Sequence, residues 1–165
     1  MIVQTTHPAL TKILPYQNSA PVDVVRTAKE VFGLNVWSDQ MDAGISGKLM
    51  PDQINGGPSG YSVIVNGKEP YYRQRFTVAH EIAHFVLHRQ QIQLIASGIT
   101  DDVFYRSTLS NAQEAEANRF AADVLMPYAL IESLIAGGTS SVPALASALQ
   151  VSETAMTVRL GIPIP

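Results

Sequence analysis

The chain has 165 residues and no cysteine, with 46% hydrophobic residues, 15% charged residues and a formal net charge of −3. This composition suits one globular domain, and the absence of cysteine excludes disulfides and thiolate metal ligands and fits a cytosolic location. The weakly acidic balance, without a run of like charge, argues against a protein whose main task is binding nucleic-acid phosphates.

Residues 1–19 are expected to form a leader with a proline-containing turn. They lack a basic segment followed by a continuous apolar core, so a signal peptide is not expected. No stretch of the chain approaches 18 apolar residues, so a membrane span is not expected either. Residues 19–33 are predicted to form the first helix, because Pro21 is tolerated in a first turn and Gly33 is a common helix terminator.

Three short segments are typical of β-strands: residues 34–37, 45–50 and 61–67. The last is the strongest candidate, because it closes on an Asn-Gly pair that favours a tight turn. Almost everything after residue 70 has a helical pattern, with an irregular insert at about 91–109. The order of helix, strands and helices predicts an α+β fold that is mostly helical, with a small antiparallel sheet.

The predicted helix at residues 72–89 carries the sequence H-E-x-x-H at His80, Glu81 and His84. Residues four apart lie on one helix face, about 6 Å apart along the axis, so two imidazoles can bind one Zn²⁺ at about 2.0–2.1 Å per bond. Glu81 lies about 100° round the helix, where it can act as a general base without binding the ion. Two buried histidines that bind nothing would be a costly way to build a helix face.

The third protein ligand that a catalytic zinc needs is expected on a later helix, residues 110–126, which begins with a pattern typical of a capping box. Glu114 and Asn118 lie one turn apart, and nearby alanines allow this helix to pack closely against the first. Glu114 can then complete a His-His-Glu set, with Asn118 orienting a histidine. Spacing alone leaves Glu116 open as a ligand, and a solvated helix face is the other interpretation for Glu116 and Asp123.

Four further residues are candidates for stabilising the oxyanion or contacting the substrate: His88, Tyr72, Arg75 and Tyr105. The oxyanion of a hydrolysis reaction needs a stabiliser besides the metal, and the sequence does not choose among them. His88 lies about 12 Å along the helix from His80, so one ion cannot bind both. Its alternatives are a supporting role behind the ligands, a substrate contact or a solvated helix end. The other interpretation for Arg75 is a structural ion pair with a carboxylate.

The C-terminal part is predicted to hold a helix at residues 128–136 and two small helices between 141 and 161, with a break near 150–152. This last pair has the proportions of a helix-turn-helix. It holds a single basic residue, Arg159, whereas a phosphate-binding surface should hold several. We therefore expect a packing unit or protein contact there, and no direct binding of nucleic acid.

The segments "RQRFTVAHEIAHFVLH" (73–88) and "EAEANRFAADVLMP" (114–127) resemble the ImmA/IrrE family of zinc metallopeptidases. That family has an H-E-x-x-H helix and a later E-x-x-x-N helix that leads into Leu-Met-Pro. The resemblance covers about residues 20–160 and implies a zincin-like domain. It also implies that the zinc ligands are His80, His84 and Glu114. The catalytic glutamate that it implies is Glu81.

The resemblance implies a zinc-dependent endopeptidase that cleaves a helix-turn-helix repressor or similar regulatory protein in trans, in transcription regulation or a toxin–antitoxin setting. Residues 1–165 are expected to form one domain, with a catalytic core at 20–136 and a small helical pair at 140–160. The alternative is a metal-containing module that binds a repressor or antitoxin partner without proteolysis. Hydrolysis of a non-peptide substrate also stays open, because H-E-x-x-H does not specify the bond that is cleaved.

Overall fold

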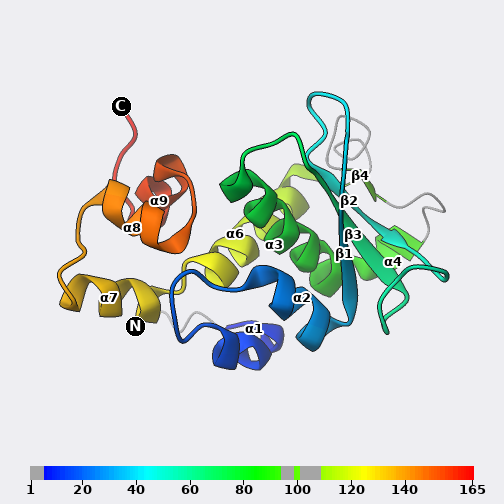
Figure 1. Cartoon of the computed structure of the whole chain (residues 1–165), viewed down its shortest axis with the longest axis horizontal. Coiled ribbons are helices and arrows are strands. Elements are labelled where there is room, and N and C mark those ends of the chain that lie inside the picture. The colour runs from blue at the N-terminus through cyan, green and yellow to red at the C-terminus, as the bar shows by residue number, and fades with distance from the viewer. Residues whose placement is uncertain (1–5, 94–98, 101–108) are drawn as a thin grey trace.

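The computed structural model of the chain describes residues 6–93, 99–100 and 109–165. Figure 1 shows a small twisted sheet on one side of the long helix α3 and further helices on the other. The elements follow in this order: α1 (Pro8–Ile13), η1 (Leu14–Tyr16), α2 (Val24–Phe32), β1 (Leu34–Asp39), β2 (Gly47–Pro51), β3 (Tyr61–Asn66), α3 (Tyr71–Leu87), α4 (Arg89–Gln93), β4 (Ile99–Thr100), α6 (Asn111–Leu125), α7 (Tyr128–Ala136), α8 (Val142–Leu149) and α9 (Glu153–Arg159).

The predicted α+β class with a mostly helical content is confirmed, and the sheet has the order β1-β3-β2-β4. Strand β2 is antiparallel to both β3 and β4, as expected. Strand β1 differs, because it pairs with β3 in parallel. The cause is the order in space: β3 inserts between β1 and β2, which run in opposite directions, so it must be parallel to one of them. The sheet is therefore mixed.

Helix α3 is the central element, packed against α6, α2 and strands β2 and β3. Every residue from 77 to 85 is buried. The sheet approaches this helix closely at Gly47, where a Cβ atom would lie 2.5 Å from the Thr77 side chain and 2.6 Å from the Ile64 carbonyl oxygen. Only glycine allows this contact, so Gly47 sets the distance between the sheet and α3.

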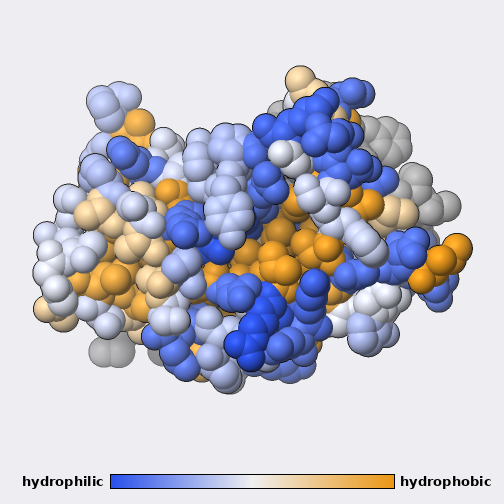
Figure 2. Space-filling model, viewed as in Figure 1, coloured by the Kyte–Doolittle hydropathy of each residue, from blue (hydrophilic) through white to orange (hydrophobic). Residues whose placement is uncertain are grey.

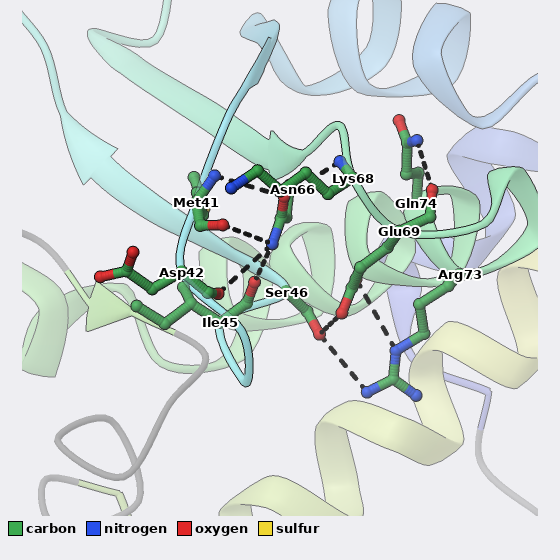
Figure 3. Close-up of polar contacts among 9 residues, drawn as sticks. All are labelled: Met41, Asp42, Ile45, Ser46, Asn66, Lys68, Glu69, Arg73 and Gln74. Atoms are coloured by element: carbon green, nitrogen blue, oxygen red, sulfur yellow. Dashed lines mark hydrogen bonds and ion pairs between the residues drawn. The ribbon is translucent and has the colours of Figure 1, made fainter.

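The start of α3 is tied to the connection between β1 and β2 by a polar cluster (Figure 3). The Asn66 side chain donates to the Ile45 carbonyl oxygen at 2.8 Å and accepts from the Lys68 backbone N–H at 3.0 Å. The Ser46 hydroxyl donates to the Glu69 carboxylate at 2.9 Å. These bonds fix the orientation in which the chain leaves β3 and enters α3, which in turn sets where the motif residues point.

The N-terminal segment is more ordered than the predicted leader with a turn. His7 caps α1 by accepting a hydrogen bond from the Ala9 N–H at 3.1 Å, Pro8 occupies the first helical turn, and Ile13 is fully buried. Proline lacks the N–H that would be unsatisfied at this position, so it favours a helix start here. Helix α1 contacts α2 and α6, and so the chain from Pro8 onwards is part of the packed structure.

The later helices begin and end close to where their patterns predict. Ser110 and Gln113 form the predicted capping box of α6, and the break between α8 and α9 falls at Gln150, which has a positive φ of 52°.

None of the described helices is long and apolar enough to cross a membrane. Figure 2 shows apolar residues gathered across the middle of one face, bordered by hydrophilic residues.

Candidate metal centre

The two motif histidines lie on the face of α3 that packs against α6. His80 is 4% exposed and His84 is fully buried, and their Nε2 atoms are 2.9 Å apart. Glu81 is also fully buried. A burial this complete is costly for three ionisable groups unless they interact with one another or with a bound cation. The helix therefore brings two imidazole nitrogens to one point, as the four-residue spacing predicts.

Helix α6 adds a carboxylate at the same point. Glu114 places Oε2 3.3 Å from the His80 Nε2 atom and Oε1 3.5 Å from the His84 Nε2 atom. Ligand atoms on a tetrahedral zinc ion at 2.0–2.1 Å are about 3.3 Å apart, so both carboxylate distances suit a shared ion. Among the described residues, His80, His84 and Glu114 form the group able to hold a metal ion. This agrees with the choice of Glu114 as third ligand.

Asn118 lies behind His80, as predicted. Its side-chain oxygen is 2.9 Å from the His80 Nδ1 atom. An amide oxygen accepts hydrogen bonds, so this contact requires a proton on Nδ1 and leaves the lone pair of Nε2 directed at Glu114 and His84. A partner on the far nitrogen of a ligating histidine fixes both its tautomer and its ring orientation. Asn118 therefore holds the His80 ring with its Nε2 atom towards Glu114 and His84.

The protonation state of His84 also suits metal binding. Burial lowers the pKa of His84 far below its usual range, and the neighbouring His80 and His88 lower it further. Desolvation disfavours the imidazolium, so the ring is neutral at physiological pH. A neutral imidazole is the form that binds a metal.

His88 is buried, 4% exposed, so it is not a solvated helix end. Its Nδ1 atom is 2.9 Å from the Nδ1 atom of His84, and its Nε2 atom is 3.9 Å from the Glu116 carboxylate. Burial lowers the pKa of His88, while Glu116 and Glu114 oppose that shift. Of the alternatives that the sequence left open, the solvated helix end is wrong, and the structure places His88 next to His84.

Glu116 and Asp123 lie on the more open side of α6. The Glu116 side chain is 49% exposed, and its described ion-pair partner is His88. The Asp123 side chain is 42% exposed and forms an ion pair with Arg159 at 2.8 Å. Neither belongs to the three-residue cluster. A solvated helix face was the other interpretation for both, and the structure shows them half-exposed, each with an ion-pair partner.

Arg75 serves the fold. Arg75 is 5% exposed, and its guanidinium donates to the carbonyl oxygens of Val22 at 2.8 Å, Gln150 at 3.3 Å and Leu149 at 3.4 Å. The expected carboxylate partner is therefore replaced by three main-chain carbonyls. Burial lowers the pKa of Arg75, but a guanidinium stays charged at any physiological pH. These bonds connect the end of α8 and the segment just before α2 to the first half of α3.

Of the two candidate tyrosines, Tyr72 is 45% exposed and borders a surface groove, whereas Tyr105 lies outside the described residues. The groove has a volume of about 1140 Å³. Phe76 and Asn118 stand in its wall, and both contact His80: the Phe76 and His80 ring centroids are 6.3 Å apart. The rest of its lining includes apolar side chains from elements far apart in the sequence: Leu10, Leu14, Phe120, Met126 and Val158.

Comparisons with known proteins identify a family and a similar fold. The model of the IrrE N-terminal-like domain, Peptidase_M78, matches residues 30–161. The chain belongs to this family. The ImmA/IrrE resemblance is thus confirmed, and the family makes the cluster on α3 and α6 the candidate metal centre of a metallopeptidase-like domain.

Among solved structures, this Peptidase_M78 member is similar to a Mycobacterium tuberculosis transcriptional regulator, with a TM-score of 0.57 and 16% sequence identity. The alignment covers 84% of this chain and 40% of that protein, so the chain spans less than half of its structural relative. At this identity the likeness shows a shared fold. No curated protein has significant sequence similarity to the chain.

Groove residues from η1 and α9 had no signal in the sequence. Leu14 and Val158, at 57% and 61% exposed, belong to no motif, and only the fold brings them beside Phe76. The sequence does contain a pattern that places His88 with the motif histidines. It stands four residues after His84, so the spacing that joins the two motif histidines also joins His84 and His88.

Proposed function

We propose that this chain is a zinc-dependent endopeptidase that cleaves a helix-turn-helix repressor or a similar regulatory protein in trans. The observation that carries this proposal is the convergence of His80, His84 and Glu114, from two helices, beside the fully buried Glu81. The absence of cysteine fits action in the cytosol.

The residues present fit a zinc ion. His80 and His84 would hold it through Nε2, and Glu114 through its carboxylate; this two-histidine, one-glutamate set is one of the known catalytic zinc sets. Bound there, zinc would lower the pKa of a coordinated water from about 15.7 towards about 7 and polarise the scissile carbonyl. Asn118 keeps the His80 lone pair turned towards the ligand set.

Glu81 would act as the proton carrier. It is next to His80 on α3 and buried, and the motif places it beside the ligand set without making it a member. Its carboxylate would accept a proton from the attacking water and deliver it to the leaving amine of the cleaved peptide bond. A general base of this kind typically contributes about 10²–10⁴-fold in rate.

The groove supports a polypeptide substrate over a small molecule. Its wall includes Phe76 and Asn118, which both contact His80, and its volume of about 1140 Å³ is bordered by apolar side chains from several elements. Small-molecule sites are concave and enclose most of their ligand, whereas an open groove suits an extended chain. The similar fold of a protein described as a transcriptional regulator agrees with a regulatory setting.

Cleavage of a repressor tests the proposal. The zinc-loaded chain would be incubated with a helix-turn-helix repressor encoded beside it, and mass spectrometry should find one discrete cut. The Glu81→Gln variant is the matched control: it should keep zinc and lose cleavage by about 10³-fold. If the repressor binds equally to both proteins and neither cuts it, the chain is a binding module instead.

A further inference from the structure

A buried pair of histidines stands behind the metal centre. His84 faces Glu114 and His80 with its Nε2 atom, while its Nδ1 atom lies 2.9 Å from the Nδ1 atom of His88. His88 is the C-terminal cap of α3, and its backbone N–H donates to the His84 carbonyl oxygen at 2.9 Å. Two neutral imidazoles at this distance share one hydrogen bond, in which one nitrogen donates and the other accepts.

The direction of this hydrogen bond decides whether His84 is able to bind a cation. If His88 donates, the proton of His84 sits on Nε2, in the middle of the ligand set. If His84 donates, its Nε2 atom presents a lone pair there. Each neutral ring carries a single N–H, so the choice made at Nδ1 sets the choice at Nε2.

Glu116 favours the second arrangement. Its carboxylate lies 3.9 Å from the Nε2 atom of His88, and Nε2 is buried without a hydrogen-bond partner among the described residues. A carboxylate attracts an N–H and repels a lone pair, so the His88 proton belongs on Nε2. The Nδ1 atom of His88 is then left with its lone pair, as an acceptor for His84.

We propose that His88 is a positioning residue: its Nδ1 atom accepts the Nδ1–H of His84 and so holds the His84 Nε2 lone pair towards Glu114. The inference rests on the metal-binding part of the proposed function. It gives each histidine ligand its own acceptor from behind, Asn118 for His80 and His88 for His84. The two ligands are thus oriented by different helices, His80 from α6 and His84 from the end of its own helix.

Two substitutions separate this role from mere packing. His88→Leu fills much of the same space but removes the acceptor, whereas His88→Asn keeps a side-chain oxygen close to the position of Nδ1. Loss of an orienting partner typically costs 10–100-fold in metal affinity. We therefore expect about 10–100-fold weaker zinc binding for His88→Leu and a change of no more than about threefold for His88→Asn. The measurement is competition for zinc against a chromogenic chelator.

A stability control accompanies the pair. Ile92, one turn further along in α4, is fully buried, and Ile92→Ala empties its position without removing a polar partner. This variant should lose stability and keep the zinc affinity of the parent protein. Equal weakening in His88→Leu and His88→Asn, or undiminished affinity in His88→Leu, would overturn the proposal.

The tautomer can also be read directly in the unmodified protein. Long-range ¹H–¹⁵N NMR of the zinc-loaded chain should show His84 with its proton on Nδ1 and His88 with its proton on Nε2. A zinc-bound Nδ1 atom on His84 would contradict the proposal even if His88→Leu failed to fold. Neither measurement involves cleavage, so a protein that binds zinc in this way yet cuts nothing would remove the proposed peptidase activity and leave this inference standing.

Discussion

Helix α3 holds two kinds of buried ionisable group within three turns. Near its start, Arg75 directs its guanidinium at the carbonyl oxygens of Val22, Leu149 and Gln150. In its middle, His80 and His84 turn their ring nitrogens towards each other and towards Glu114. Both sets are removed from water, and both come from a helix that would otherwise be an apolar core element.

The difference between the two sets lies in their partners. A main-chain carbonyl oxygen does not titrate, so the hydrogen bonds that Arg75 donates persist at any physiological pH. These hydrogen bonds stabilise the fold. The partners of His80 and His84 include other titratable side chains, and the three side chains His80, His84 and Glu114 form a group that could hold a metal ion. A buried ionisable residue indicates a functional site when its neighbours are also ionisable.

The largest expected effect is at the third ligand. Glu114→Ala removes one of three ligating side chains, and zinc affinity should fall by more than the 10–100-fold typical of a lost orienting partner, that is by more than about 100-fold. Glu116→Ala, two residues along the same helix, is the control and should cost far less. Chelator competition checks both, and equal losses in the two variants would refute the ligand assignment.

Arg75→Met, in contrast to Glu114→Ala, is expected to lower the stability of the protein and to leave its zinc affinity nearly unchanged. Three buried carbonyls lose their donor, so the free energy of unfolding should fall by about 3 kcal/mol, while zinc affinity in the folded protein stays within about twofold. Urea denaturation measures the first quantity. Arg26→Met is the control, because Arg26 forms an exposed ion pair with Glu30 and such a pair is worth about 0–1 kcal/mol. A variant with full stability and weakened zinc binding would put Arg75 in the site.

Asn118→Leu is expected to weaken zinc binding by about 10–100-fold, because His80 loses the acceptor that orients it. The fold should be nearly unaffected, since Asn118 is exposed. Asn118→Asp, which keeps an acceptor oxygen, is the matched variant and should retain most of the affinity. If both substitutions weakened zinc binding equally, the orienting hydrogen bond would not be the cause.

The smallest expected effect is a loss of stability of the metal-free protein at acidic pH. Because burial lowers the pKa of His84, the unfolded chain binds a proton near pH 6.5 that the metal-free folded chain does not. Stability of the metal-free protein is therefore complete above about pH 6.5 and declines below it, by about 1 kcal/mol from pH 6.5 to 5.5. Urea denaturation at the two pH values checks this, and His84→Phe should reduce the dependence. A stability that rises on acidification would contradict a buried neutral ring.

Much of the site followed from local rules. The spacing of His80 and His84 is fixed by the helix period, and the capping box at Ser110 sets the start of α6 and hence the phase of Glu114 and Asn118. What local rules left open was resolved by packing. Spacing left both Glu114 and Glu116 open as the third ligand, and the family resemblance favoured Glu114, the carboxylate that the structure places beside His80 and His84.

Other features depend on contacts between distant segments. The parallel pairing of β1 with β3 arises because β3 inserts between two strands that precede it, and nothing within those strands specifies that order. The partners of Arg75 lie 53 to 75 residues away in the chain. The groove beside His80 is lined by α1 and α9, from opposite ends of the described chain.

The sequence alone determined the chemistry available to this protein: two imidazoles and a glutamate at helical spacing, and a second helix with a carboxylate and an amide one turn apart. Helix geometry is a local property, so these patterns were sufficient. The tertiary structure decided which carboxylate meets the imidazoles, what stands behind His84 and which surface opens beside His80. Those outcomes depend on how separate helices pack, and packing is set by the fit of the whole core.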